Sequence, residues 1–125
     1  MLLVRGRVRS SRIHGLGLFA DQFIAKGTII WKFQPGFDVE IPEDCLPSLS
    51  PAAQEQVLHY ACYEKDKRRF ILSSDDDRFS NHDDNPNTIQ NGDTMYACRD
   101  IAFGEEITCS YHEVVMLNFR PKVIV

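Results

Sequence analysis

Two short segments near the end of the chain carry the residues best suited to chemistry. Residues 78–87 read Arg-Phe-Ser-Asn-His-Asp-Asp-Asn-Pro-Asn, and residues 104–111 read Gly-Glu-Glu-Ile-Thr-Cys-Ser-Tyr. The amides and carboxylates of the first segment can bind nearby backbone groups, so a polar structural turn is one interpretation of it. The second segment ends in Tyr111, which could pack its ring in a strand or present its hydroxyl to a ligand. The role of both segments depends on whether the fold brings them together.

Metal chemistry finds little support in the residue pattern. The acidic run Asp75-Asp76-Asp77 lacks the alternation and the central glycine of a calcium loop. The four cysteines form no C-x-x-C pair and have no regular spacing; they are Cys45, Cys62, Cys98 and Cys109. The sequence therefore predicts neither a metal site nor a disulfide framework, and it favours reduced cysteines that pack as small hydrophobic residues.

Size and charge limit the classes of function. The chain has 125 residues, enough for one compact domain, and its formal charge is 14 − 18 = −4. Such a charge provides no strong basic field, so we do not expect nucleic acid as a direct partner. A mildly acidic surface suits a cationic polypeptide instead. The arginine-containing N-terminus and the lack of a long apolar run predict an intracellular protein without a membrane span, in the cytoplasm or the nucleus.

Alternation and turn residues predict a mostly β fold. Val4, Gly6 and Val8 alternate with arginines, which is typical of a half-buried strand with a basic outer face. The hairpin signal Asn91-Gly92-Asp93 joins two further short strands. Ser50 is a good cap for a single helix, in which Pro51 takes the first position. Other short strands are expected at residues 18–20, 28–33, 37–41, 70–72 and 107–111.

Three motifs in this order resemble those of the SET-domain protein-lysine methyltransferases. The first is Gly15-Leu16-Gly17 within residues 14–20, similar to the family's G-x-G-x-F/V-A. Residues 78–87 are similar to R-F-x-N-H-S-x-x-P-N, and residues 104–111 to G-E-E-L/I-x-x-D/S-Y. The resemblance covers about residues 4–113. It identifies residues 1–125 as a single SET domain in which residues 114–125 form a lid or tail.

The resemblance implies a fold and a reaction. The fold is a β-clip-like arrangement of small twisted sheets with one short helix and a knot-like C-terminal crossing, which would bring Asn81 and Tyr111 together. The implied reaction transfers a methyl group from S-adenosyl-L-methionine to a lysine side chain of a protein, for which a histone is a candidate. The nucleophile must be a neutral amine, and an apolar channel beside a positive sulfonium lowers the pKa of lysine.

The resemblance also implies the site residues. Tyr111 is the expected catalytic residue, which orients the amine and contacts the cofactor. Asn81 and His82 are expected to bind the cofactor. Residues 15–17 are expected to bind it as well, because glycine lets the backbone approach a ligand closely. As a lone histidine, His82 could also be a structural group.

The remaining assignments concern the substrate channel and its closure. A second channel tyrosine is expected at Tyr63, with Tyr60 as the alternative, both at the end of the predicted helix. Trp31 and Phe33 are expected in the core. Phe119 is a candidate lid aromatic.

Three departures from the family pattern leave other functions open. Asp83 replaces the serine after Asn-His, Ser110 replaces the aspartate before the tyrosine, and no cysteine follows Cys109 to form a zinc segment. The tail or the second chain of a homodimer would then close the site. A SET module that binds cofactor or a partner protein without activity remains an alternative, as does a structural β domain.

Overall fold

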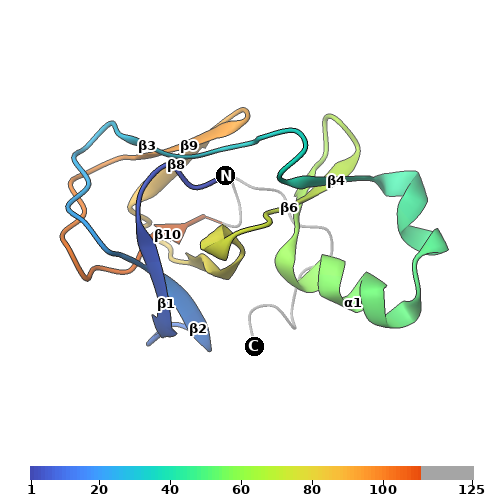
Figure 1. Ribbon diagram of the computed structural model, residues 1–125, viewed down its shortest axis with the longest axis horizontal. Helices are drawn as coiled ribbons and strands as arrows, with labels where there is room; N and C mark the ends of the chain where they lie inside the picture. Colours follow the sequence, from blue (N-terminus) through green and yellow to red (C-terminus); the bar gives the residue numbers. More distant parts are fainter. Residues whose placement is uncertain (111–125) are drawn as a thin grey trace.

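The computed structural model describes residues 1–110, which form four small sheets around two hydrophobic cores (Figure 1). The strands are β1 (Gly6–Ser10), β2 (Leu16–Ala20), β3 (Ile29–Lys32), β4 (Val39–Pro42), β5 (Cys62–Glu64), β6 (Arg69–Leu72), β7 (Asn81–His82), β8 (Thr88–Asn91), β9 (Thr94–Ala97) and β10 (Thr108–Cys109). One α-helix, α1 (Pro51–Tyr60), and two 3₁₀ helices, η1 (Glu43–Ser48) and η2 (Asp76–Phe79), complete these elements. The predicted mostly β fold is confirmed.

The first sheet is the antiparallel hairpin β1–β2. Its register pairs Gly6 with Ala20 and Ser10 with Leu16, and the inward side includes the fully buried Leu18. The arginines between these positions are exposed, as the alternation predicts. The other side of β2 binds the chain near residues 104–107, because Gly104 N–H donates to Ala20 O and Ile107 N–H donates to Leu18 O, each at 2.8 Å.

The second sheet has the order β3-β9-β8, and its hairpin confirms the predicted turn. Asn91 pairs with Thr94, so Gly92 and Asp93 are the two turn residues. Gly92 takes a positive φ of 61°, which glycine adopts without a steric penalty. Apolar side chains from this sheet join those of β2 in the larger core, which contains Leu18, Ile30, Met95, Ile101 and Ile107 among others.

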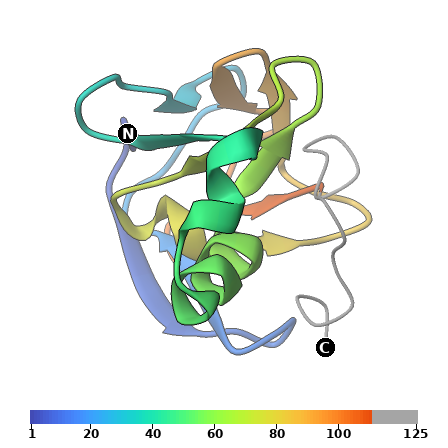
Figure 2. The same cartoon turned by 90° about the vertical axis from the view of Figure 1, so that its right-hand side faces the viewer.

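The other half of the molecule combines α1 with the sheet β4-β6-β5, visible on the right of Figure 1 and facing the viewer in Figure 2. The predicted helix start is correct, since Ser50 Oγ accepts a hydrogen bond from Ala53 N–H at 3.1 Å. A smaller core of Val57, Ala61, Tyr63 and Phe70 lies beneath the helix. The predicted helix end is wrong for Tyr63, because the helix stops at Tyr60 and Tyr63 lies in β5.

The fourth sheet is a parallel pair between β7 and β10, which joins the two polar segments. Thr108 pairs with Asn81 and Cys109 with His82, and Asp83 N–H donates to Cys109 O at 3.0 Å. Beyond β7 the chain turns back, and the Asn87 side chain binds the same segment from the other end of the loop. Residues 106–109 are thus held between β2, β7 and residues 87–88. This arrangement brings the two polar segments side by side, as the family resemblance implies.

Candidate active site

Asn81 connects the loop before β2 with the segment that follows Gly104. Its side-chain amide Nδ2 lies 3.1 Å from His14 O, 3.0 Å from Leu16 O and 3.0 Å from Glu106 Oε2. Asn81 is buried, with 6% of its surface exposed. A buried amide with three acceptors within hydrogen-bond distance fixes the position of the loop that carries Gly15. Three motifs that are distant in sequence therefore meet at this one side chain.

Glu106 is the second connection, and it explains the glycine at position 17. Its carboxylate accepts hydrogen bonds from Ser11 Oγ, 2.9 Å from each oxygen, and from Asn81. A Cβ atom at Gly17 would lie against this carboxylate, 2.9 Å from Glu106 Cδ and 3.0 Å from Ser11 Cβ. Gly17 is therefore required for the close approach of Glu106 to the backbone of β2. Glycine is favoured at position 15 for a different reason, because the φ of 47° there lies in the left-handed region.

A smaller cavity of about 140 Å³ opens beside these groups. Its wall contains the backbone around Gly15, the buried amide of Asn81 and the aromatic rings of Tyr60 and Phe79. Gly15 contributes no side chain, and a Cβ atom there would meet nothing within 4 Å. The lining thus combines main chain, one amide, aromatic and imidazole rings, and the polar side chains of Arg78 and Ser80, a set that can bind a ligand with both polar and planar parts.

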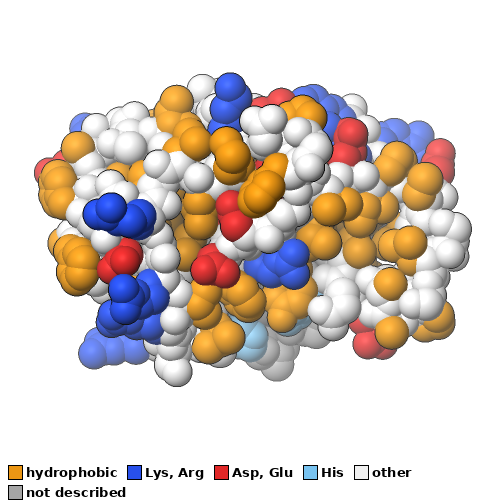
Figure 3. Space-filling view, in the orientation of Figure 1, with side chains coloured by type: hydrophobic (Ala, Val, Ile, Leu, Met, Phe, Trp, Pro, Cys, Tyr) orange, Lys and Arg blue, Asp and Glu red, His pale blue; other side chains and the backbone are white. Residues whose placement is uncertain are grey.

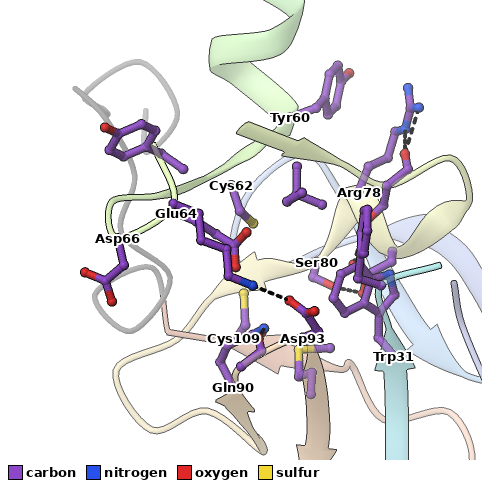
Figure 4. Close-up of a pocket in the computed structure, with 18 of the residues that line it drawn as sticks. Trp31, Tyr60, Cys62, Glu64, Asp66, Arg78, Ser80, Gln90, Asp93 and Cys109 are labelled. Carbon is purple, nitrogen blue, oxygen red and sulfur yellow. Dashed lines mark hydrogen bonds and ion pairs between the residues drawn. The ribbon is translucent and has the colours of Figure 1, made fainter. Parts of the chain in front are cut away.

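A larger cavity of about 360 Å³ lies between the two cores (Figure 4). Trp31, Ile71 and Met95 line it from the larger core, and Tyr63 lines it from the smaller one. Its mouth carries charged side chains, including Glu64, Asp66, Lys67 and Asp93. The Trp31 indole is buried, and its Nε1 donor has no hydrogen-bond partner within the described residues. Glu64 and Asp93 are paired with Arg69 and Lys67, which leaves Asp66 as the exposed unpaired carboxylate of the lining within residues 1–110. An apolar interior with such a carboxylate suits a long aliphatic side chain that ends in a cation.

The two cavities share one wall. Four residues line both, namely His59, Tyr60, Arg78 and Ser80. The Arg78 guanidinium donates to Ser73 O from Nε at 3.1 Å and from Nη2 at 2.9 Å. It lies 5.7 Å from the centre of the Tyr60 ring, which makes an edge contact with Phe79 at 5.8 Å between ring centres. This packing fixes Tyr60 at the junction of the two cavities.

The family model of the SET domain matches residues 15–112 of the sequence. The match extends from the first glycine motif to just beyond the second polar segment. The chain belongs to the SET-domain family. The expected SET domain and its fold are therefore confirmed. No curated protein matches the chain in sequence.

Solved SET-domain structures share this fold at low identity. The Polycomb Repressive Complex 2 of Chaetomium thermophilum bound to GSK126 has a TM-score of 0.72 and 17% identity. That match covers 92% of this chain and 16% of the other. A candidate histone methyltransferase of Plasmodium falciparum has a TM-score of 0.59 and 24% identity, over 88% of this chain and 95% of the other. The chain thus spans about a sixth of the Chaetomium protein and nearly all of the Plasmodium one.

The predicted cofactor residues of the SET domain lie together. Asn81 and Gly15-Leu16-Gly17 meet through the hydrogen bonds described above, and Asn81, Gly15 and Leu16 line the smaller cavity. His82 is adjacent in β7, and its Nε2 lies 2.8 Å from Asp84 Oδ1. Tyr111 and Phe119 lie outside the described residues, and their assigned roles stay predictions.

The two candidate channel tyrosines have different surroundings in the SET domain. Tyr63 is buried, its ring lies 5.1 Å from that of Phe70, and its hydroxyl donates to the Glu43 carboxylate. That hydrogen bond, followed by burial, raises the pKa of Tyr63, and the same bond lowers the pKa of Glu43. Tyr60 instead lines both cavities. The structure therefore favours Tyr60, the alternative choice, as the tyrosine at the junction.

Several residues of the SET-domain site have no assigned role in the sequence analysis. Glu106 and Arg78 stand in the motifs, but only the structure gives Glu106 its contacts with Ser11 and Asn81. Asp77 lines the larger cavity, and removal from water raises its pKa to about 6 even though Ser73 Oγ donates to it at 3.0 Å. Its position directly before Arg-Phe is the only sequence signal that could have identified it.

The described part of the SET domain contains neither a cluster of metal ligands nor a helix that could span a membrane. Across residues 1–110, no three His, Cys, Asp or Glu side chains converge as a metal site would require. The same residues contain no helix with the length and hydropathy needed to cross a bilayer.

The larger cavity includes Cys62. Burial raises the pKa of its thiol to about 12, so the thiol stays protonated.

Proposed function

We propose that this SET domain is an S-adenosyl-L-methionine-dependent protein-lysine methyltransferase. The observation that carries the proposal is the pair of cavities with a common wall at Tyr60, Arg78 and Ser80. A methyl transfer by in-line displacement needs donor and acceptor to approach from opposite sides. Two adjoining cavities, one polar and aromatic and the other apolar, meet this requirement.

The residues of the smaller cavity suit one part of the proposed cofactor, since its volume of about 140 Å³ is below the roughly 300 Å³ of a typical ligand site. The main chain at Gly15 and Leu16 offers carbonyl and amide groups, and the Tyr60 and Phe79 rings offer planar surfaces. Gly15 leaves open space where a side chain would otherwise project. Asn81 would hold the cofactor together with this loop, while His82 follows it in β7, lines neither cavity and stays a predicted cofactor residue. When bound, S-adenosyl-L-methionine supplies a methyl group activated by a sulfonium.

The larger cavity fits the lysine side chain. Trp31, Ile71 and Met95 provide apolar walls, which disfavour the ammonium form and so lower the pKa of an entering lysine. Asp66, an exposed carboxylate of the lining that forms no ion pair within residues 1–110, would attract a cationic peptide. A histone-like protein is such a substrate. We infer that Tyr60 orients the amine from one side, and that Tyr111 is its counterpart.

Other parts of the proposal rest on the sequence alone. They are a single domain over residues 1–125, a lid at residues 114–125 that includes Phe119, and an intracellular location in the cytoplasm or the nucleus. A homodimer could supply the closure instead of the lid.

The experiment separates binding from transfer. Saturating S-adenosyl-L-methionine should raise the melting temperature, because a ligand at a hundred times its Kd stabilises by about 2.7 kcal/mol. Labelled methyl should then appear on lysine residues of a histone panel. Tyr111→Phe should lower the rate or alter the number of methyl groups added, whereas the matched control Tyr96→Phe, which lines neither cavity, should change neither.

Two negative results have distinct meanings. Absence of any thermal shift at saturating cofactor would reject cofactor binding and with it the proposed function. A thermal shift without labelling of any protein in the panel would favour the inactive module, since Asp83 already departs from the family serine.

A further inference from the structure

Four arginines lie along the outer side of the first hairpin. Arg5, Arg7 and Arg9 alternate along and beside β1, Arg12 follows in the next loop, and all four are exposed. We call this set the arginine row. Figure 3 shows Lys and Arg side chains gathered at the lower left, over the β1–β2 hairpin. The proposed methyl transfer makes no use of these residues.

The arginine row is largely without acidic partners. Arg7 Nη2 lies 3.2 Å from Asp21 Oδ2, an exposed pair that contributes little to stability. No ion pair engages Arg5, Arg9 or Arg12 within the described residues.

Arginines elsewhere in the described chain are engaged. Arg68 and Arg69 pair with carboxylates, and Arg78 and Arg99 donate to backbone carbonyls. The free guanidinium groups are thus concentrated on one hairpin, although the whole chain has a charge of −4.

The hairpin also holds these groups at a regular spacing. Alternate residues of a strand are about 6.6–6.8 Å apart, because a strand rises about 3.3–3.4 Å per residue. Phosphates recur regularly along each strand of duplex DNA, so a regularly spaced group of cations on a rigid hairpin can contact several of them. The strand is fixed from its inner side, where Leu18 pairs with Val8 and is fully buried. The row is therefore a preformed line of cations rather than a flexible tail.

We propose that the arginine row binds the phosphate backbone of duplex DNA without sequence preference. Guanidinium groups match phosphate geometry with two parallel hydrogen bonds, which favours arginine over lysine for this contact. The inference differs from the expectation drawn from net charge, because an average over the chain conceals a local cluster. It does not depend on methyltransferase activity, so the two proposals can fail separately.

The test measures binding of the full chain to a short fluorescent DNA duplex by anisotropy over a range of salt concentrations. Binding at low salt should weaken with a log–log slope of about −3, because each neutralised phosphate contributes about −0.9. The triple variant Arg5→Gln, Arg9→Gln, Arg12→Gln should lose at least about tenfold in affinity and most of that slope. The matched control Lys32→Gln, Lys65→Gln, Lys67→Gln removes the same charge from other exposed positions and should retain the affinity within about twofold.

Several outcomes would overturn the proposal. They are no binding of the duplex at low salt, equal loss in the two triple variants, and displacement of the duplex by poly-glutamate at matched charge, which would indicate an acidic protein partner. Circular dichroism and the melting temperature of both variants establish that they are folded. Retained affinity in the folded hairpin variant would likewise reject the row as the binding surface.

Discussion

Asn87 and Thr108 bind each other through backbone and side chain at once. Thr108 N–H donates to Asn87 Oδ1 at 2.8 Å, while Asn87 N–H donates to Thr108 Oγ1 at 3.2 Å. Asn87 Nδ2 also donates to Glu106 O at 2.8 Å, and 2% of Asn87 is exposed. This exchange holds the second polar segment against the loop of the first. It explains why both segments need their particular residues.

Asn87→Ala should destabilise the domain strongly. The change leaves the Thr108 N–H and the Glu106 carbonyl without partners, and each buried unsatisfied group costs about 1–3 kcal/mol. We expect a loss of about 2–4 kcal/mol in the free energy of unfolding, measured with urea. Asn85→Ala is the matched control, since Asn85 is exposed, and it should stay within about 0.5 kcal/mol of the parent. Equal losses in the two variants would contradict the role given to Asn87.

Gly17→Ala should weaken cofactor binding by displacing Glu106. The new methyl group would overlap the carboxylate that binds Ser11 and Asn81. The Asn81 amide would then lose an acceptor beside the cavity wall. Isothermal titration with S-adenosyl-L-methionine should show a reduced affinity.

A double-mutant cycle isolates that steric cause. In the Glu106→Ala background the carboxylate is absent, so Gly17→Ala should cost less in stability and in affinity than it does in the parent. If the effects of the two substitutions on stability and affinity are additive, the methyl group introduced by Gly17→Ala does not clash with Glu106.

Tyr60→Phe should lower the catalytic rate and leave stability nearly unchanged, whereas Tyr63→Phe should lower stability and leave the rate unchanged. Tyr60 lines both cavities, so loss of its hydroxyl should reduce kcat by at least about tenfold, or change the number of methyl groups added, with little effect on stability. Tyr63 is buried against Phe70 and bonded to Glu43, so its variant should unfold more easily and keep its rate. Steady-state kinetics and thermal unfolding of both proteins decide between them. A severe kinetic defect in Tyr63→Phe alone would restore Tyr63 as the channel residue.

The hydrogen bond between Tyr63 and Glu43 should make stability depend on pH at both ends of the range. The pKa of Glu43 is lowered from 4.5, so its stabilisation is present above pH 4.5 and is lost as the pH falls through the folded value. The pKa of Tyr63 is raised from 10.0, so its contribution is lost as the pH rises through a value above 10.0. The difference in unfolding free energy between parent and Tyr63→Phe should therefore be largest between these limits. A difference that stays constant into acid would show that the bond contributes nothing.

Asp77→Asn should stabilise the domain at neutral pH. Burial raises the pKa of Asp77 from 3.8 to about 6, so the folded parent is most favoured when Asp77 is protonated, below pH 3.8. The parent then loses stability as the pH rises from 3.8 through about 6. The variant avoids this loss, so its advantage in urea unfolding should grow as the pH rises from 3.8 through about 6 and should vanish in acid. Ser73→Ala should have the reverse effect, because it removes a donor to the ionised carboxylate.

The sequence predicted local features better than those that depend on distant partners. The Ser50 cap and the turn at Gly92 are determined by neighbouring residues, and both were correct. Asn81 and His82 have low strand propensity and form β7 only because β10 pairs with them. Tyr63 was placed on the helix because the chain offers no strong stop after Tyr60. Its pairing with Phe70 across the sheet is a tertiary contact that periodicity does not report.

For the site residues as well, the sequence predicted less where a feature depends on contacts between distant residues. The family resemblance assigned Asn81 and Gly15-Leu16-Gly17 to one cofactor, which stays a prediction, and the structure brings these residues together. The cavity between the two cores, with Asp77 in its wall, depends on which side chains leave space between sheets. No pattern of spacing along a chain contains that information.

The contact between Asn87 and Thr108 also bears on the order of folding. Its partners are 21 positions apart, and Thr108 reaches Asn81 from 27 positions away, so both contacts require closure of a long loop before they stabilise the chain. The hairpins β1–β2 and β8–β9 are local and can form earlier. We expect pulse-labelled hydrogen exchange to show late protection of the Thr108 amide, after that of β9. The last contacts to form would then be those that assemble the candidate site, so partly folded chains would carry both hairpins and no place for a ligand.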